Sequence, residues 1–430
     1  MSNPDTITAV KGFRDVLPDE TRRWRLLDEA AARVFGRYGF EEIGLPIVER
    51  TELFARSIGD TTDIVEKEMY SFADRDGTSL TLRPEATAGV VRAYLESGLA
   101  QRDPTARLYY RGPMFRRERP QRGRYRQFHQ IGVEAFGRED PLVDAELLVM
   151  LTRYLDDVGA RDTRLELNSV GDAVCRPVYR ERLRAFGTAR LAELCPDCHR
   201  RLERNPLRIL DCKVESCRRV VASAPVVLDS LCDGCRAHLD AVRALLEQES
   251  VPYTMNPRLV RGLDYYTRTA FEVVGATLGA QNAVGGGGRY DGLVAALGGP
   301  DVSGIGFALG VERLAMVVPA EVGAEIPPAV AVLPLAPEAV GPAFGLATRL
   351  RDAGLSVALE PAGRSVKALL RAADRRRARV AFILGEDELR AGRATIRDLV
   401  RHEDRRQALA LDAPSAVLAE TVRSMLGGDA

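Results

Sequence analysis

Two predicted strands and the loop between them make up residues 108–136, which read LYYRGPMFRRERPQRGRYRQFHQIGVEAF. Apolar and aromatic residues predict the strands over Leu108–Met114 and Phe128–Phe136. The stretch Arg111–Arg126, which includes the loop, holds seven arginines against one glutamate. A solvated charged loop is one interpretation. The other is that some guanidinium groups face inward from the strand ends and bind phosphates, since planar guanidinium holds phosphate oxygens through paired N–H bonds.

The rest of the chain divides into regions of different character. Apolar spacing predicts a helix over Trp24–Tyr38, and Asp76-Gly77 supplies the turn of a second hairpin over Met69–Leu82. All seven cysteines lie in a later, mainly helical segment, which strands and glycine turns follow. The predicted regions are 1–171 for the first part of the main domain, 172–250 for the helical insertion, 251–324 for the second part of the main domain and 325–430 for a C-terminal domain.

The C-terminal region has its own regular pattern. Glu325–Pro328 is typical of a linker, and VAVLPL, a helical stretch, Val357–Glu360, a second helical stretch from Ser365 and VAFILG follow it. This β-α-β-α-β alternation predicts a small α/β domain.

Length and composition exclude several classes of protein. The 430 residues exceed one ordinary domain, and 46% hydrophobic with 28% charged residues is typical of a soluble globular chain. No apolar run approaches the ~18 residues that a membrane helix needs. The N-terminal MSNPDTITAV lacks the basic and apolar regions of a secretory signal. We therefore expect a cytoplasmic protein without a membrane partner, and the formal net charge of zero gives no general attraction to nucleic acid.

Three further motifs could form a site. Arg261–Tyr266 (RGLDYY) ends in adjacent tyrosines, of which one would line a pocket and the other pack if the stretch is a strand; a core strand with a surface arginine is the alternative. Gly285–Asp291 (GGGGRYD) allows the backbone to approach a ligand closely. Gly304–Arg313 (GIGFALGVER) ends in an arginine that reaches a phosphate or is a surface cation. No Walker-type phosphate loop or dinucleotide fingerprint occurs, so arginines would have to bind ATP.

Five blocks, in order along nearly the whole chain, resemble the histidyl-tRNA synthetase family of class II aminoacyl-tRNA synthetases. They are TLRPEATAG (81–89), FRRERPQRGRYRQFHQIGVE (115–134), RGLDYYT (261–267), GGRYD (287–291) and GFALGVERL (306–314). One departure, Ala86 where many members have glycine, changes little. The resemblance implies an α+β catalytic domain on an antiparallel sheet, a helical insertion and a small C-terminal α/β domain that binds the anticodon.

The resemblance also implies a reaction and partners. ATP, with Mg²⁺, would activate L-histidine to histidyl-adenylate and release diphosphate, and the histidine would then pass to the 3′ end of tRNA(His). Pro46 and its strand resemble the first class II motif, which implies a homodimer.

Histidine-binding residues follow from the same resemblance. Glu85, Thr87 and Gln130 match the positions that hold the α-amino group. Glu134 and Tyr266 match the pair that reads the imidazole, and Tyr265 lies beside them. Imidazole offers one donor and one acceptor, so a carboxylate and a phenol can satisfy both edges.

The resemblance assigns the phosphate-binding and catalytic residues as well. Arg116 matches the arginine on the α-phosphate, and Arg124 and Arg313 match arginines near the outer phosphates. Arg261 matches a family arginine that faces the α-phosphate during attack. The implied catalytic set is therefore Arg261, Arg116 and Glu85, and Arg119 with Gln121 match residues that meet the tRNA acceptor end.

The cysteines form two C-x-x-C pairs, Cys195 with Cys198 and Cys232 with Cys235. In a cytosolic chain such pairs favour a metal site over disulfides, and together they predict one structural zinc ion. The family's insertion often has no metal, so a local structural role is the alternative. A zinc ion here is expected to lie away from the aminoacylation chemistry.

Two other functions share this sequence pattern. The regulatory subunit of ATP phosphoribosyltransferase has the same catalytic fold but typically lacks the C-terminal domain and has lost catalytic blocks. A histidine-sensing RNA-binding protein is the second alternative. The intact RGLDYY and GGRYD blocks and Arg116 favour an enzyme over both.

Overall fold

The computed structural model describes residues 7–59, 62, 64–210, 212–279, 282–319, 329–401 and 409–426. The chain forms two compact units, residues 1–324 and 325–430. Among the described helices, none is both long and apolar enough to cross a membrane. The predicted linker Glu325–Pro328 lies outside the described residues.

An eight-stranded sheet forms the centre of the first unit, in the order β1-β5-β6-β11-β10-β9-β7-β8. Its inner pairings are antiparallel, as predicted, whereas β1 pairs with β5 and β7 pairs with β8 in parallel at the two edges. The strands are β1 Glu41–Glu42, β5 Arg107–Phe115, β6 Gln127–Phe136, β7 Thr163–Ser169, β8 Thr254–Met255, β9 Thr267–Gly275, β10 Ala283–Arg289 and β11 Gly304–Gly310.

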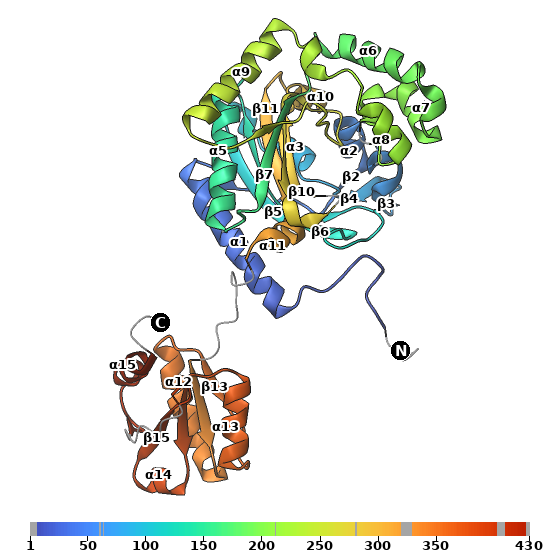
Figure 1. Cartoon of the computed structure of the whole chain (residues 1–430). Coiled ribbons are helices and arrows are strands. Elements are labelled where there is room, and N and C mark those ends of the chain that lie inside the picture. Colours follow the sequence, from blue (N-terminus) through green and yellow to red (C-terminus); the bar gives the residue numbers. More distant parts are fainter. Residues whose placement is uncertain are drawn as a thin grey trace. The chain divides into compact units, whose positions relative to one another are not determined.

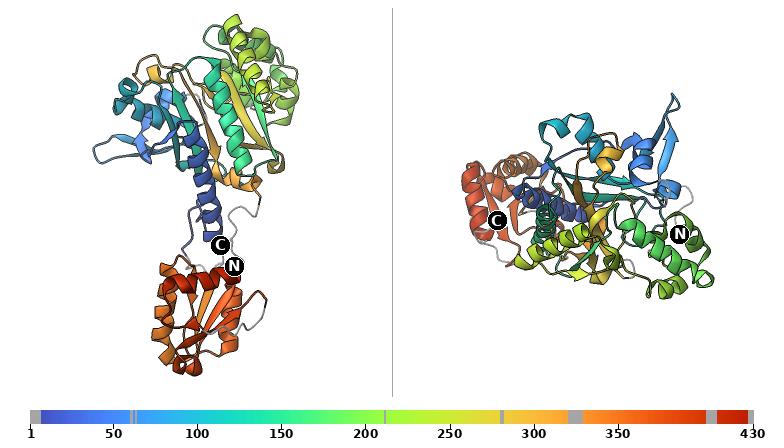
Figure 2. Two further views of the ribbon diagram at one scale, coloured as in Figure 1. Left: turned by 90° about the vertical axis from the view of Figure 1, so that its left-hand side faces the viewer. Right: turned by 90° about the horizontal axis from the view of Figure 1, so that it is seen from above.

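Strand alternation gives this sheet two different faces. In β6, Ile131, Val133 and Ala135 belong to the large apolar core, while Gln130 and Glu134 lie on the opposite side of the strand. Long helices cover the apolar face and leave the polar face for a site (Figure 1; Figure 2, left). These helices are α1 Pro18–Arg37, α5 Pro141–Asp157, α9 Asp233–Gln248 and α11 Val311–Val317.

Shorter elements surround the polar face. They are α2 Thr51–Ile58, the π-helix η1 Ile64–Glu68, α3 Thr87–Glu96, α4 Leu99–Arg102, α10 Leu293–Ala296, and a three-stranded sheet of β2 Val48–Arg50, β4 Ser79–Leu82 and β3 Tyr70–Ala73. The short η5 Ala276–Leu278 packs on α11, on the apolar side. The β3–β4 hairpin agrees with the prediction. Strand β2 begins only at Val48, because Pro46 has no N–H for pairing and its carbonyl accepts instead from Arg83 Nη1 at 3.2 Å.

The chain between β7 and β8 is helical, in agreement with the predicted insertion (Figure 1). It starts with α6 and closes with the long α9, which packs on α5. Its elements are α6 Arg176–Thr188, η2 Leu191–Glu193, α7 Pro196–Arg204, η3 Pro206–Ile209, α8 Glu215–Val221, η4 Val227–Ser230 and α9.

The second unit has a five-stranded sheet in the order β13-β12-β14-β15-β16. The predicted β-α-β-α-β part is parallel, and β15 and β16 extend it in antiparallel fashion. Alternate residues of β12 pack on α12 and α15 on one face and on α13 on the other. The elements are β12 Val330–Pro334, η6 Pro337–Ala339, α12 Val340–Asp352, β13 Val357–Leu359, α13 Val366–Arg375, β14 Val380–Leu384, α14 Glu386–Arg390, β15 Arg393–Asp398, β16 Leu409–Ala410 and α15 Ser415–Leu426.

Candidate active site

A cavity of about 200 Å³ opens on the polar face of the eight-stranded sheet. Glycines in β10 and β11 form part of its floor, and no larger residue fits at two of them. A Cβ on Gly306 would lie 1.9 Å from Glu134 Oε2, and one on Gly286 would lie 2.9 Å from Arg261 Nη1. The glycine-rich blocks therefore make room for the charged side chains that line the cavity.

Glu134 lies at the inner end of the cavity, on β6, and is almost completely buried. Thr87 Oγ1 donates to its Oε1 at 2.7 Å, and the Tyr290 hydroxyl donates to its Oε2 at 2.7 Å. Burial raises the pKa of Glu134 to about 8, although these hydrogen bonds oppose the shift. The inner end therefore holds a carboxyl that gains or loses its proton near pH 8.

Glu85 is the second buried carboxyl at the inner end. It precedes helix α3 and accepts from the backbone N–H groups of Thr87 at 2.7 Å and Ala88 at 2.9 Å. Burial raises the pKa of Glu85, and the two backbone hydrogen bonds counteract the shift. The first turn of α3 thus fixes the carboxylate in place, as helix N-termini do for anions.

Tyr265 and Tyr266 both line the cavity, so the expectation that only one of them would do so is wrong. The residues Arg261–Tyr266 form a turn before β9 and not a strand, so their side chains do not alternate. The two rings lie 4.7 Å apart between centroids. Together with Glu85, Thr87, Glu134 and Tyr290 they form what we call the inner end.

Four arginines also line the cavity, and we call them together the arginine end: Arg116, Arg124, Arg261 and Arg313. Arg116 Nε donates to the carbonyl of Pro84 at 2.8 Å, and its guanidinium lies 5.4 Å from the ring centroid of Phe128. These contacts hold the guanidinium against the sheet, and its Nη1 lies 3.9 Å from Glu118 Oε1.

Arg124 and Arg313 lie close enough to influence each other. Arg124 Nη1 is 3.2 Å from Glu118 Oε2. Burial and, to a lesser extent, the positive charge of Arg124 lower the pKa of Arg313 to about 10. Arg313 is still charged at neutral pH, and an anion placed between the two guanidiniums would relieve their repulsion.

Arg261 occupies the boundary between the two ends. Its guanidinium pairs with Glu272 Oε1 on β9 and lies 6.0 Å from the ring centroid of Tyr266. Arg261 would therefore contact the middle of a ligand that occupies both the inner end and the arginine end.

Most of the predicted site residues meet in this one cavity. Those that line it are Glu85, Thr87, Arg116, Arg124, Gln130, Glu134, Arg261, Tyr265, Tyr266 and Arg313. Arg119 and Gln121 are exposed on the loop after β5, outside the cavity lining.

Comparison with known proteins shows which family the chain belongs to. The family model "Histidyl-tRNA synthetase" matches residues 12–314, and "Anticodon binding domain" matches residues 329–421. The chain belongs to the histidyl-tRNA synthetase family.

Curated relatives and a solved structure cover nearly all of this histidyl-tRNA synthetase family member. It is 54% identical over 391 residues to the histidine–tRNA ligase of Geobacter metallireducens, covering 91% of this chain and 94% of the relative. It is 50% identical to the histidine–tRNA ligase of Syntrophotalea carbinolica, and the match covers 97% of this chain and 99% of the relative. The crystal structure of apo Staphylococcus aureus histidyl-tRNA synthetase superposes with a TM-score of 0.79 at 35% identity, covering 96% of this chain and 100% of that chain.

Sequence reasoning missed several residues of the histidyl-tRNA synthetase cavity. Tyr290 belongs to the GGRYD block, yet its contact with Glu134 follows only from the fold. Tyr110, on β5, lies over Gly132, where a Cβ would meet its hydroxyl at 2.4 Å. Glu118 was visible as the lone acid of the arginine-rich stretch, whereas nothing in the strand pattern of β9 distinguished Glu272.

The predicted zinc ligand set of the histidyl-tRNA synthetase insertion is wrong. Cys195 and Cys198 lie with Cys212 and Cys217, whereas Cys232 and Cys235 lie with Asp172 and Cys175. The reason is that α7 packs near α8, while the start of α9 returns to the beginning of the insertion. Cys195 and Cys212 of the first group line a cleft that Arg116, Arg124 and Arg261 also line.

Proposed function

We propose that the cavity binds L-histidine at its inner end and ATP at its arginine end, joins them as histidyl-adenylate, and then transfers histidine to the 3′ end of tRNA(His). One observation carries this proposal: buried carboxyl and phenol groups and a set of arginines line the same cavity and meet at Arg261. A free amino acid with an imidazole side chain and a polyphosphate are the ligands that match these two ends.

At the inner end, Glu134 and Tyr266 are the pair proposed to read the imidazole, with Tyr265 beside them. Glu85, Thr87 and Gln130 are proposed to hold the α-amino group. A buried site that loses water and offers hydrogen bonds discriminates strongly against apolar analogues, because its polar groups would be left unpaired. Tyr290 supports this role by holding Glu134 through a 2.7 Å hydrogen bond.

At the arginine end, an oxygen of the histidine carboxylate attacks the α-phosphorus of ATP. A new P–O bond forms, the bond from the α-phosphorus to the bridging oxygen breaks, and diphosphate leaves with the electron pair. We propose that Arg116 and Arg261 stabilise the α-phosphoryl oxygens, while Arg124 and Arg313 hold the outer phosphates. Fixed cations act here by positioning and by stabilising developing charge.

Mg²⁺ is expected together with ATP. Its preferred oxygen ligands are present in Glu118 and Glu272, but each of these carboxylates already pairs with an arginine. We therefore propose that Mg²⁺ enters with the ATP phosphates, where it would neutralise charge on the departing diphosphate.

In the second half-reaction, a hydroxyl of the terminal ribose attacks the histidyl carbonyl carbon, a C–O bond forms, and AMP leaves. Arg119 and Gln121 are proposed to contact the tRNA acceptor end, which their exposure beside the cavity supports. The second unit is proposed to bind the anticodon, which the match to an anticodon-binding model supports.

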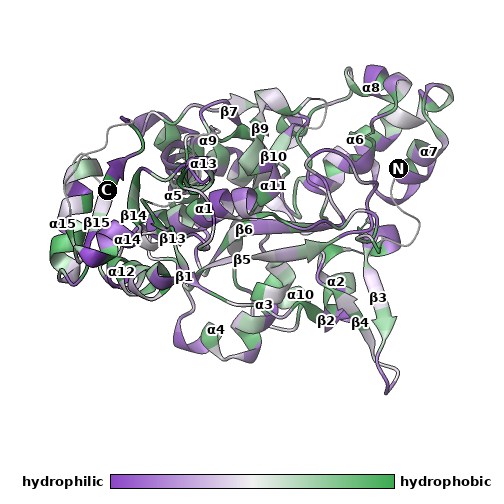
Figure 3. Ribbon diagram, turned by 90° about the horizontal axis from the view of Figure 1, so that it is seen from below, coloured by the Kyte–Doolittle hydropathy of each residue, from purple (hydrophilic) through white to green (hydrophobic). Residues whose placement is uncertain are grey.

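We also propose a cytoplasmic homodimer. The face around Pro46 is the proposed interface, and nearby Ile47, Val48 and Phe72 are 44%, 39% and 47% exposed. Figure 3 shows hydrophobic stretches on the small β2–β4 sheet to which the last two belong. Light scattering that gives the mass of two chains at micromolar concentration would support the dimer, and the mass of one chain would exclude it.

The experiment for the proposed function is ATP–pyrophosphate exchange with each of the twenty amino acids in turn. Exchange with histidine alone is the expected result. Folded protein that catalyses no exchange with any amino acid, but binds histidine, would instead support the histidine-sensor function.

A further inference from the structure

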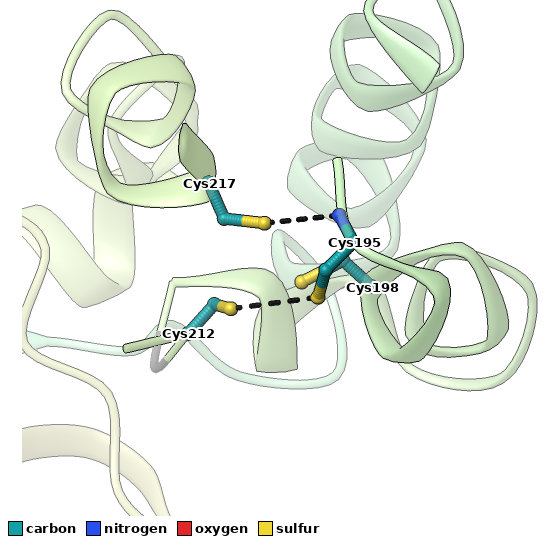
Figure 4. Close-up of side chains that lie close together, drawn as sticks. All are labelled: Cys195, Cys198, Cys212 and Cys217. Atoms are coloured by element: carbon teal, nitrogen blue, oxygen red, sulfur yellow. Dashed lines mark hydrogen bonds between the residues drawn. The ribbon is translucent and has the colours of Figure 1, made fainter. Parts of the chain in front are cut away.

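Four cysteine side chains of the insertion converge on one point (Figure 4). Cys195 precedes α7 and Cys198 lies in its first turn, Cys212 follows η3, and Cys217 lies in α8. All four sulfurs are within 4.8 Å of one another, and three of these cysteines are buried. The group therefore joins three parts of the insertion that are separate in sequence.

The spacing of the sulfurs fits a metal ion better than disulfides. A disulfide needs sulfurs about 2.05 Å apart, whereas Cys195 Sγ and Cys212 Sγ are 3.9 Å apart. Zn–S bonds of about 2.3 Å in a tetrahedron place neighbouring sulfurs about 3.8 Å apart. In addition, the backbone N–H of Cys195 donates to Cys217 Sγ at 3.1 Å, a contact that stabilises a thiolate ligand.

Charged side chains of both signs lie near the group. Four thiolates around Zn²⁺ carry a net charge of −2. Arg201, Arg208 and Lys213 line the cleft beside Cys195 and Cys212, together with the acidic Glu68 and Asp197. Cysteines that act only as small hydrophobic residues would not require this convergence of four sulfurs.

The segment between Cys198 and Cys212 also forms hydrogen bonds to the loop that contains Arg261. Asn205 Nδ2 donates to Asp264 Oδ1 at 3.0 Å. Arg208 Nη2 donates to the carbonyl of Gly262 at 2.8 Å and lies 3.3 Å from Asp264 Oδ1. Since Asn205 and Arg208 lie between Cys198 and Cys212, anything that fixes the cysteines also fixes the support of this loop.

We propose that Cys195, Cys198, Cys212 and Cys217 bind one structural zinc ion, with release of their thiol protons, and that this site positions Arg261 through Asn205 and Arg208. The zinc site is independent of the proposed function. The proposed effect of the zinc site on Arg261, in contrast, rests on the proposed function. The residues here are positioning residues, because they contact the loop and not the substrates.

The second group offers an internal comparison. Asp172 Oδ1 accepts from the backbone N–H of Val174 at 3.0 Å and of Cys175 at 3.2 Å, and it also accepts from the Cys175 thiol at 3.4 Å. The second group thus combines three cysteines with one carboxylate and shares no residue with the first group. Cys232, in this second group, is therefore the matched control for a cysteine of the first group.

Metal analysis tests the site. Full-length protein purified without chelator is compared with Cys195→Ser, Cys217→Ser and Cys232→Ser, and Co²⁺ is substituted into the unaltered protein. We expect Cys195→Ser and Cys217→Ser each to remove one zinc per chain, Cys232→Ser to retain it, and Co²⁺ to give the absorption of a tetrahedral thiolate site. Absence of zinc and of the Co²⁺ signal, or loss of the same zinc in Cys232→Ser, would overturn the assignment. If a variant fails to fold, the charge-transfer intensity of the cobalt protein still decides, because the first group offers four thiolates and the second group only three.

Removal and return of zinc tests the positioning role. Chelation should lower kcat for histidine-dependent pyrophosphate exchange by about 10-fold or more, because displacement of a catalytic group by ~1 Å can cost 10²-fold. The KM for histidine should stay unchanged, and added zinc should restore kcat. An unchanged kcat after complete zinc removal, or parallel loss of kcat and histidine binding, would refute the role. Zinc-loaded protein that shows no exchange at all contradicts the proposed function and leaves the metal analysis standing.

Discussion

At the inner end of the cavity Glu85 and Glu134 are only 4% and 1% exposed, whereas at the arginine end the side chains of Arg124 and Glu118 remain 31% and 23% exposed. Burial raises the pKa of both inner carboxyls, while the arginine end keeps its charges by pairing and partial hydration. This difference indicates that the inner end discriminates between ligands, whereas the arginine end stabilises phosphate charge. Changes at the two ends should therefore affect different kinetic constants.

The largest expected effect is that of Arg261→Ala on adenylate formation. Loss of a preorganised cation at the α-phosphate should lower the rate by about 10²–10³-fold, with histidine affinity little changed. Single-turnover formation of adenylate gives the measurement, and Arg164→Ala, which removes an exposed arginine of the same sheet, is the control. The double variant Arg261→Ala/Glu272→Ala separates this loss from repulsion by the unpaired Glu272. A decrease of less than fivefold would contradict the role of Arg261.

The next effect concerns Glu134→Gln. Removal of one charged hydrogen-bond partner of the imidazole should raise the KM for histidine by about 10–100-fold, with a smaller change in kcat. Steady-state exchange at varied histidine concentration measures both, and Glu96→Gln on an exposed helix face serves as the control. If the KM for histidine does not change, Glu134 does not read the imidazole.

Gly306→Ala tests whether the glycine floor places Glu134. The added Cβ would lie 1.9 Å from Glu134 Oε2 and 2.4 Å from the Val133 carbonyl, so we expect a loss of about 1–3 kcal/mol in the free energy of unfolding. The KM for histidine should also rise, as it should in Glu134→Gln. Denaturant unfolding and exchange kinetics measure the two effects. Gly36→Ala, where a Cβ meets nothing within 4 Å, should leave the KM unchanged and raise the free energy of unfolding by at most about 1 kcal/mol, because alanine favours a helix over glycine.

The smallest expected effect is a pH dependence of histidine binding. The pKa of Glu134 is raised to about 8, and that of the free histidine imidazole is near 6.5. Between these two pH values the carboxyl is protonated and the imidazole is neutral, so the pair carries the one proton that its hydrogen bond needs. Above pH 8 both partners have lost the proton, so binding must take one up and the affinity should fall by up to about tenfold per pH unit. Below about pH 6.5 both the carboxyl and the imidazole are protonated, so binding must release one proton and the affinity should fall again. Calorimetry from pH 6 to 9 checks this, and Glu134→Gln should lose the alkaline decrease.

Local patterns in the sequence predicted the parts of the fold that depend on neighbouring residues. The β5–β6 pair and the β3–β4 hairpin follow from apolar strand patterns and turn residues, and the C-terminal domain follows from continuous apolar runs that alternate with helical stretches. The same period places Gln130 and Glu134 on one face of β6. Their functional roles came from a family resemblance, because one strand pattern does not distinguish a binding residue from a buried polar one.

Other features depend on packing between distant segments, which spacing does not encode. The two C-x-x-C pairs look alike in sequence, yet Cys198 packs toward α8 and Cys235 packs toward Cys175, with 3.8 Å between the sulfurs of the latter two. Tyr110 similarly enters the cavity because Gly132 lies opposite it on the neighbouring strand. Such contacts become visible only once the strand register and helix packing are known.

The measurement that tests the separation of the two ends most directly is calorimetry of histidine binding in the absence of ATP, on the unaltered protein, Glu134→Gln and Arg261→Ala. The account predicts that Arg261→Ala binds histidine with unaltered affinity and that Glu134→Gln binds it at least tenfold more weakly. Equal weakening in both variants, or full affinity in Glu134→Gln, would contradict it.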